Sequence, residues 1–186
     1  MKASIRKWSA KTVVTIGAGA VLYGATSWIG IPIVEDTHLR PAIALLTIFG
    51  ALFGPVIGFI VGLVGHVLHD YLTGGTVWWG WALSSGITAA FMGLVYLSKD
   101  FDPHKGQIRK KHILQLLIYG LIGIFTSLVF SGLFDIFIMG EPNDKIVFVQ
   151  TLTAGLANSF VFIVLGIPAV WAYANRDRSH TYESDH

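Results

Sequence analysis

The sequence contains no cysteine and few charged residues, and both shortages limit what the protein can be. Without cysteine the chain forms no disulfide and no thiolate metal site. Charged residues make up only 13% of the 186 residues, whereas a soluble domain carries about a quarter. Hydrophobic residues reach 53%. The composition therefore predicts an integral membrane protein, with length for one domain over residues 1–186.

Motifs of the common enzyme classes are also missing. The sequence has no HExxH zinc-protease motif, no G-x-S-x-G nucleophile motif and no phosphate-binding P-loop. We therefore expect a protein that is not an enzyme and has no cofactor. If the protein works against a gradient, the energy must come from elsewhere.

Long apolar segments divide the chain into helices. A helix that crosses a membrane needs about 20 apolar residues, and we predict an all-α bundle of six transmembrane helices. The weaker alternative is five helices, with the second and third segments forming a re-entrant hairpin around the Gly54-Pro55 turn. The six predicted spans are residues 12–30, 39–53, 56–71, 78–97, 112–139 and 147–173.

Basic residues predict the orientation of these helices. Six spans place both termini on the same side as the loop between residues 97 and 112, and all but Arg40 and Lys145 of the 13 lysines and arginines lie on that side. Since basic residues favour the cytoplasmic side, we expect both termini in the cytoplasm. This bias accounts for the net charge of +2 without a nucleic-acid partner.

The stretch from Phe53 to Trp81 combines small, polar and aromatic residues. His66 and Asp70 are four residues apart on an apolar helix, so both lie on one helical face. An acid within a membrane helix is costly and marks a candidate functional site. Further polar and aromatic residues fall near the outer ends of other helices. We predict that they converge on one outward-facing pocket for a small molecule, with His66, Asp70, Trp78, Trp79, Trp81, Asp135, Glu141, Gln150 and Asn158 as its candidate residues.

Several of these residues have an alternative interpretation. The tryptophans are either interfacial anchors or rings that stack on a flat aromatic ligand. Gln150 and Asn158 either contact the ligand or form hydrogen bonds between helices, and Glu141 is either solvated or part of a lid.

The histidines raise two further possibilities. Asp70 and His66 either contact the ligand or form an internal pair that fixes their helix. Alternatively, His66, His69 and Asp70 contribute to a divalent-metal site, for which a further ligand must come from elsewhere.

The first helix carries a stripe of small residues formed by Gly17, Ala20 and Gly24. Small residues at this spacing let another helix approach closely. The stripe either packs inside the bundle or presents a docking surface to a partner protein.

Two blocks of sequence resemble a known family. The first runs Gly65-His66…Asp70…Trp78-Trp79-x-Trp81, after the glycines Gly58 and Gly62, and the second contains Asp135, Glu141-Pro142, Gln150 and Asn158-Ser159. Both are similar to the substrate-binding S components of energy-coupling factor (ECF) transporters, and most similar to the HmpT family of hydroxymethylpyrimidine and pyridoxine transporters.

The resemblance implies a function and a set of partners. S components are six-helix proteins of the bacterial plasma membrane that bind a vitamin or its precursor from outside. They dock on a transmembrane coupling protein (T component) that carries two ATPase subunits. By this resemblance the small-residue stripe is the docking face, and the ligand is a small aromatic heterocycle such as hydroxymethylpyrimidine or pyridoxine. The alternative is an uptake subunit for nickel, cobalt or zinc that uses His66, His69 and Asp70.

Overall fold

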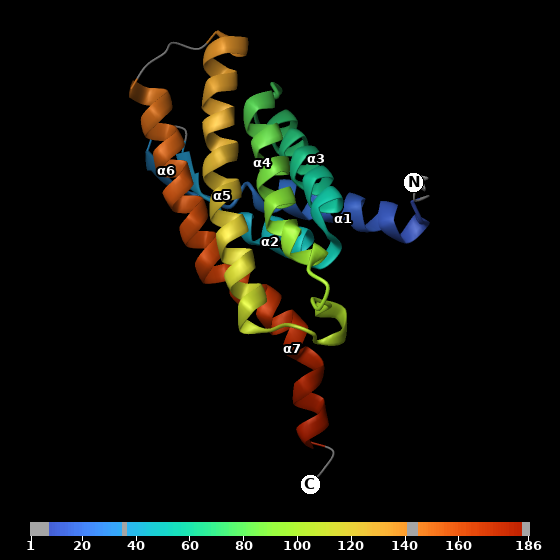
Figure 1. Ribbon diagram of the computed structural model, residues 1–186. Helices are drawn as coiled ribbons and strands as arrows, with labels where there is room; N and C mark the ends of the chain where they lie inside the picture. Colours follow the sequence, from blue (N-terminus) through green and yellow to red (C-terminus); the bar gives the residue numbers. More distant parts are fainter. Residues whose placement is uncertain (1–7, 35–36, 141–144, 184–186) are drawn as a thin grey trace, which may run out of the picture.

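The computed structural model describes residues 8–34, 37–140 and 145–183. Within these ranges the helices join end to end into six continuous helical rods (Figure 1), which confirms the six-helix, all-α prediction. Four rods are long and apolar enough to cross a membrane. The rods are α1 (Ala10–Thr26), α2 (Ile43–Phe53), α3 (Pro55–Gly74), α4 (Trp79–Met92) with η1 (Gly93–Leu97), α5 (Lys110–Phe134) with η3 (Asp135–Met139), and α6 (Lys145–Val161) with η4 (Phe162–Gly166) and α7 (Ile167–Glu183).

A short antiparallel hairpin occupies the outer loop that was predicted between the first two helices. Strand β1 (Ile31–Val34) pairs with β2 (Thr37–Leu39), with Pro32 opposite His38. The flanking helices are also shorter than predicted: the first ends at Thr26 and not at residue 30, and the second begins at Ile43 and not at residue 39. Pro32 lies within β1 and Pro41 follows β2, and both disfavour helix. The hairpin packs against α6.

Glycine and proline determine where the central helices begin and end. Gly54 has a φ of 94°, and Pro55 follows it as the first residue of α3, a position that needs no backbone N–H. Gly75, with a φ of 69°, ends the same helix in the left-handed conformation. The 11-residue α2 is too short to cross a membrane by itself, and a single residue separates it from α3.

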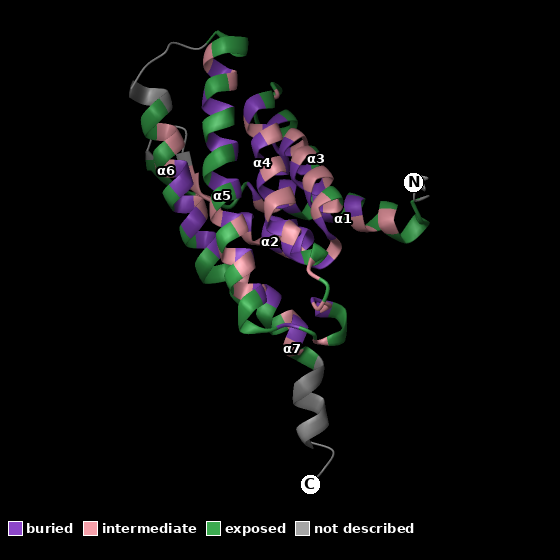
Figure 2. Ribbon diagram, viewed as in Figure 1, coloured by how far each residue is buried: buried purple, intermediate pink, exposed green. Residues whose placement is uncertain are grey.

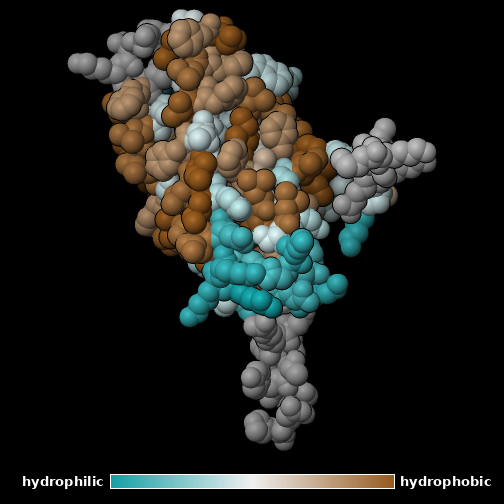
Figure 3. Space-filling view, in the orientation of Figure 1, coloured by the Kyte–Doolittle hydropathy of each residue, from teal (hydrophilic) through white to brown (hydrophobic). Residues whose placement is uncertain are grey.

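Burial and polarity divide the surface as expected for a protein in a membrane. Buried residues follow the faces on which the helices meet, and exposed residues follow the outward faces (Figure 2). The outward face of α5 is a continuous apolar stripe of Leu114, Ile118, Ile122, Phe125, Val129 and Leu133. Apolar residues cover most of the visible bundle, whereas hydrophilic residues gather at the end where the loop between η1 and α5 lies (Figure 3).

A network of charged side chains occupies this polar loop. Asp100 accepts hydrogen bonds from Lys111 and from Arg109, the latter at 3.3 Å. His112, which is fully buried, lies 3.3 Å from the same carboxylate through Nε2. The hydrogen bonds from Lys111 and His112 lower the pKa of Asp100 to about 2. The loop is thus bound to the first turn of α5.

A histidine in the same loop ties two other helices together. His104 Nε2 lies 2.9 Å from the backbone oxygen of Leu52, at the end of α2. Since that carbonyl only accepts, Nε2 donates, and Nδ1 accepts from the Tyr173 hydroxyl of α7 at 2.9 Å. The loop therefore closes the polar end of the bundle.

Candidate binding site

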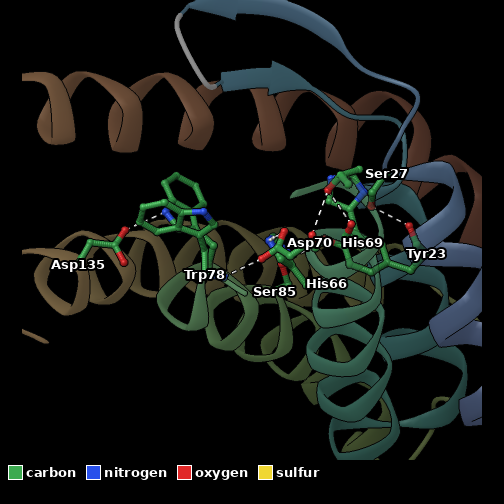
Figure 4. A network of polar contacts seen from close by, with 10 residues as sticks. Tyr23, Ser27, His66, His69, Asp70, Trp78, Ser85 and Asp135 are labelled. Carbon is green, nitrogen blue, oxygen red and sulfur yellow. Dashed lines mark hydrogen bonds and ion pairs between the residues drawn. The ribbon is translucent and has the colours of Figure 1, made fainter. Parts of the chain in front are cut away.

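Buried polar side chains from α1, α3, α4 and η3 lie close together within an otherwise apolar bundle (Figure 4). Each of these helices contributes one or two members. We refer to these residues as the polar network. It has two groups: Tyr23, Ser85, His66 and Asp70 with the backbone N–H of Trp78, and beside them the pair Trp81 and Asp135.

Ser85 of α4 connects the first and third helices. Its Oγ lies 2.7 Å from Nδ1 of His66 and 3.1 Å from the Tyr23 hydroxyl. On its other side, His66 Nε2 lies 3.4 Å from Oδ1 of Asp70. A carboxylate only accepts hydrogen bonds, so the single N–H proton of the His66 ring lies on Nε2, the nitrogen that faces Asp70. Nδ1 then accepts from Ser85, and Ser85 in turn accepts from Tyr23.

Asp70 connects α3 to the start of α4. Its second oxygen, Oδ2, accepts a hydrogen bond of 2.9 Å from the backbone N–H of Trp78. Trp78 precedes the first residue of α4, whose N-terminus has no side-chain cap. A carboxylate at this position satisfies a backbone donor and interacts favourably with the positive end of the helix dipole. The carboxylate of Asp70 thus fixes the Gly-Gly loop and the entry of the tryptophan segment.

Trp81 and Asp135 connect α4 to the outer end of the fifth rod. The indole N–H of Trp81 donates to Oδ2 of Asp135 at 2.8 Å. Gly80 makes this approach possible, because a Cβ there would lie 2.6 Å from the other carboxylate oxygen. Asp135 is also the first residue of the π-helical turn η3, and such turns occur frequently at functional sites.

Glycines bring the backbones of the participating helices together. A Cβ on Gly62 of α3 would lie 2.5 Å from the backbone oxygen of Ser85, and one on Gly65 would lie 2.7 Å from that of Ala20. These short separations exclude larger residues. The close approach of the helix backbones brings the side chains of Ser85 and Tyr23 near His66.

The remaining predicted residues have different surroundings. The side chains of Trp78 and Trp79 are 41% and 50% exposed, whereas that of Trp81 is half-buried. Gln150 and Asn158 are half-buried on α6, which packs against α5 and β2. Glu141 lies outside the described residues.

Tyr23 and Ser85 were not among the predicted site residues. Ser85 shares a helical face with Trp78 and Trp81, which was a usable signal. Tyr23 had no distinguishing pattern, because a tyrosine in a membrane helix is also typical of the interface.

The histidines have no set of further ligands for a metal ion around them in the described part of the chain. Within residues 8–34, 37–140 and 145–183, no three His, Cys, Asp or Glu side chains are placed to hold a metal ion. The rings of His66 and His69 meet edge to face with centroids 6.3 Å apart. His66 faces Ser85 and Asp70, so its nitrogens are occupied within the polar network.

The small-residue stripe of α1 lies mainly inside the bundle. Ala20 is 2% exposed, and a Cβ on Gly24 would lie 2.9 Å from the backbone oxygen of Gly65. Gly17, in contrast, is exposed and has open space around it. In this arrangement the packing interpretation holds for Ala20 and Gly24, and Gly17 is the member that a partner can reach.

Comparison with known proteins agrees with this architecture. Residues 7–175 match the family model described as "ECF-type riboflavin transporter, S component". The curated relatives include the UPF0397 protein VS_II0189 of Vibrio atlanticus (strain LGP32), which is 34% identical over 173 residues. The alignment covers 92% of this chain and 94% of that protein. No solved structure matches the chain significantly.

The family match covers nearly the whole chain, and the apolar helices have the length that such a membrane protein requires. Members of this family are embedded in the membrane and act as substrate-binding subunits of transporters, not as enzymes. Membership in this family also implies association with a T component and ATPases. This protein belongs to the family of ECF-type riboflavin transporter S components.

Proposed function

We propose that this protein captures a small aromatic vitamin or vitamin precursor from outside the cell and delivers it through an ATPase-driven coupling module. Hydroxymethylpyrimidine and pyridoxine are the substrates that we favour from the resemblance of the sequence blocks. Riboflavin is a third candidate, because the matching family model carries its name.

The observation that carries the proposal is the polar network beside the tryptophans. It combines carboxylates, an imidazole and hydroxyls with the rings of Trp78 and Trp81. Aromatic heterocycles with hydroxyl and amino groups need both kinds of contact, a ring to stack on and polar groups that determine orientation. A buried acid on a membrane helix is costly to retain without such a role.

Binding to the purified protein in detergent tests the proposal. Intrinsic fluorescence is a suitable signal because three of the six tryptophans lie in this segment. We expect saturable quenching by hydroxymethylpyrimidine, pyridoxine or riboflavin, weakened at least tenfold in Trp81→Phe and Asp70→Asn. Trp171→Phe, on α7, is the matched control and should leave the affinity unchanged. A response to nickel or zinc alone, or to none of the vitamins, would contradict the proposal.

For docking to the T component we propose the exposed side of α1 around Gly17. Val14, Gly17 and Val21 are exposed and follow one another along this side. A bulky residue there, as in Gly17→Leu, is expected to reduce co-purification with the coupling protein while vitamin binding persists. Unchanged co-purification would exclude this side of the helix.

A further inference from the structure

The loop between η1 and α5, with the first turn of α5, carries five basic residues and only two acidic ones. All five basic side chains are exposed, and they belong to the end of the bundle where hydrophilic residues gather (Figure 3). Clusters of four to eight basic residues directly beside a membrane helix are typical of surfaces that bind anionic lipids. The five residues are Lys99, Lys105, Arg109, Lys110 and Lys111.

Both acidic residues of the loop are already engaged within it. Asp100 accepts hydrogen bonds from Arg109 and Lys111. Asp102 accepts bonds from the backbone N–H groups that follow it and forms an ion pair of 3.3 Å with Lys105. The two carboxylates thus compensate three of the five cations. The remaining charge of the loop is positive.

Lys99 and Lys110 are the two cations without a counter-charge. Neither forms an ion pair with any residue that the structure describes. Asp100 follows Lys99 directly, and its carboxylate bonds to both chain neighbours of Lys110. The two lysines therefore lie on either side of one ion-paired junction, close to each other at the surface.

Lys110 also lies at the end of the apolar stripe on the outward face of α5. It is the first residue of that helix. Leu114 follows four residues later and Ile118 four residues after that, so the three side chains share one helical face. Leu114 is 56% exposed, as expected for a side chain that contacts lipid. The stripe thus runs directly from apolar side chains to an unpaired ammonium group.

The other side of the loop shows the same change from apolar to basic. Tyr96 and Leu97 are both exposed, Leu97 to 64%, and Lys99 follows two residues later. Tyrosine is enriched where a membrane meets water. Both lysines therefore lie at the level of the lipid headgroups, next to side chains at the level of the acyl chains.

We propose that this loop binds an anionic phospholipid, with the headgroup phosphate at Lys99 and Lys110 and an acyl chain along the stripe of α5. An ammonium group on a flexible stem is suited to phosphate as a point charge. An acidic protein surface would match the charge but not the adjoining apolar stripe, so the continuity of the two favours a lipid. Trp78 precedes α4, whereas this loop follows η1 at the other end of the same rod. The inference is thus independent of the proposed vitamin site.

Native mass spectrometry of the full chain, purified in detergent, tests this inference. Phosphatidylglycerol and phosphatidylcholine with identical acyl chains compete for the protein, and the ratio of the retained lipids gives the preference. The variants are Lys99→Gln, Lys110→Gln, the two together, and Lys110→Arg, which keeps the charge. Lys105→Gln is the matched control, because it removes the same charge from the same loop at a lysine that Asp102 already pairs.

We expect the wild-type protein to prefer phosphatidylglycerol about twentyfold, since each basic residue near an anionic headgroup strengthens binding about fivefold. Lys99→Gln and Lys110→Gln should each lower the preference about fivefold, and the double variant should lose it. Lys110→Arg and Lys105→Gln should keep the preference of the wild-type protein.

Three results would overturn the inference. The first is equal retention of the two lipids by the wild-type protein. The second is an equal loss of preference in Lys105→Gln and Lys110→Gln, which would show that the net charge of the loop attracts lipid without a site. The third is an unchanged lipid preference in the double variant together with lost co-purification of the ATPase subunits, which would assign the lysines to a partner protein. Vitamin affinity is measured in parallel and should be the same in all variants, so that a failure of the proposed function is recognised separately.

Discussion

Trp81 and Asp135, 54 residues apart in the sequence, are joined by a hydrogen bond of 2.8 Å between the indole N–H and a carboxylate oxygen. The contact links α4 to the π-helical turn at the end of α5. A hydrogen bond to a charged acceptor contributes about 1.5–3 kcal/mol. The pair therefore holds together the two helices that lie beside the tryptophan segment.

We expect Trp81→Phe and Asp135→Asn each to lower the thermal stability of the purified protein. Both remove the charge-assisted bond, so the double variant should be little worse than the worse single variant. The measurement is a double-mutant cycle on the free energy of unfolding, with a coupling energy of about 1–3 kcal/mol expected. Additive effects would show that the contact contributes nothing to stability.

Ser85 should matter more to stability than Tyr23, although both belong to the same chain of hydrogen bonds. Ser85→Ala removes the partners of both Tyr23 and His66, whereas Tyr23→Phe removes one bond at the end of the chain. Each buried group left without a partner costs about 1–3 kcal/mol. Unfolding in detergent should show the larger loss for Ser85→Ala. Tyr119→Phe, whose hydroxyl has no hydrogen-bond partner in the described part of the chain, is the control, and equal losses in the two network variants would refute the ordering.

Gly62→Ala should force α3 and α4 apart. The added Cβ would lie 2.5 Å from the backbone oxygen of Ser85 and 2.7 Å from its carbonyl carbon, and backbone atoms cannot move aside as a flexible side chain can. Overpacking of this kind costs about 1–3 kcal/mol. Gly74→Ala, in the same helix, meets nothing within 4 Å and should be neutral. Equal stability of the two variants would contradict the close helix contact.

The folded protein should become less stable in acid, because Asp100 then becomes protonated. The pKa of this carboxyl in the folded protein is about 2, held down by the hydrogen bonds from Lys111 and His112, against an ordinary value of 3.8. Because the folded value is the lower one, the contribution is fully present above about pH 4 and is lost as the pH falls toward 2. Melting temperatures of the wild-type protein and Asp100→Asn should therefore converge over this range. Parallel curves would show that Asp100 is not involved.

The predicted orientation can be tested with engineered cysteines, because the chain has none of its own. We expect Thr76→Cys, in the loop between α3 and α4, to react with a membrane-impermeant maleimide on intact cells. Lys105→Cys, in the loop before α5, should react only after the membrane is opened. The reverse pattern would place the termini outside.

The local sequence contained enough information for much of this architecture. Long apolar segments interrupted by Gly54-Pro55 and Gly74-Gly75 predicted the helices, since helix length and helix breakers are local properties. The spacing of His66 and Asp70 predicted that they share a helical face, and they do lie 3.4 Å apart. The β hairpin was missed because its two strands have only four and three residues, and so short a segment does not show the alternation that identifies a strand; it was interpreted as a loop.

Which helix faces meet depends on contacts between distant residues, and only the tertiary structure decided it. Tyr23 reaches Ser85 across 62 positions, and no pattern in either segment identifies the other. The same applies to Ala20 and Gly24, whose small size suits an external partner as well as α3, and whose burial selects α3. The sequence by itself determined the helices and the family. The rotation of each helix about its axis, which depends on the packing of all its neighbours, decided which polar side chains form the network.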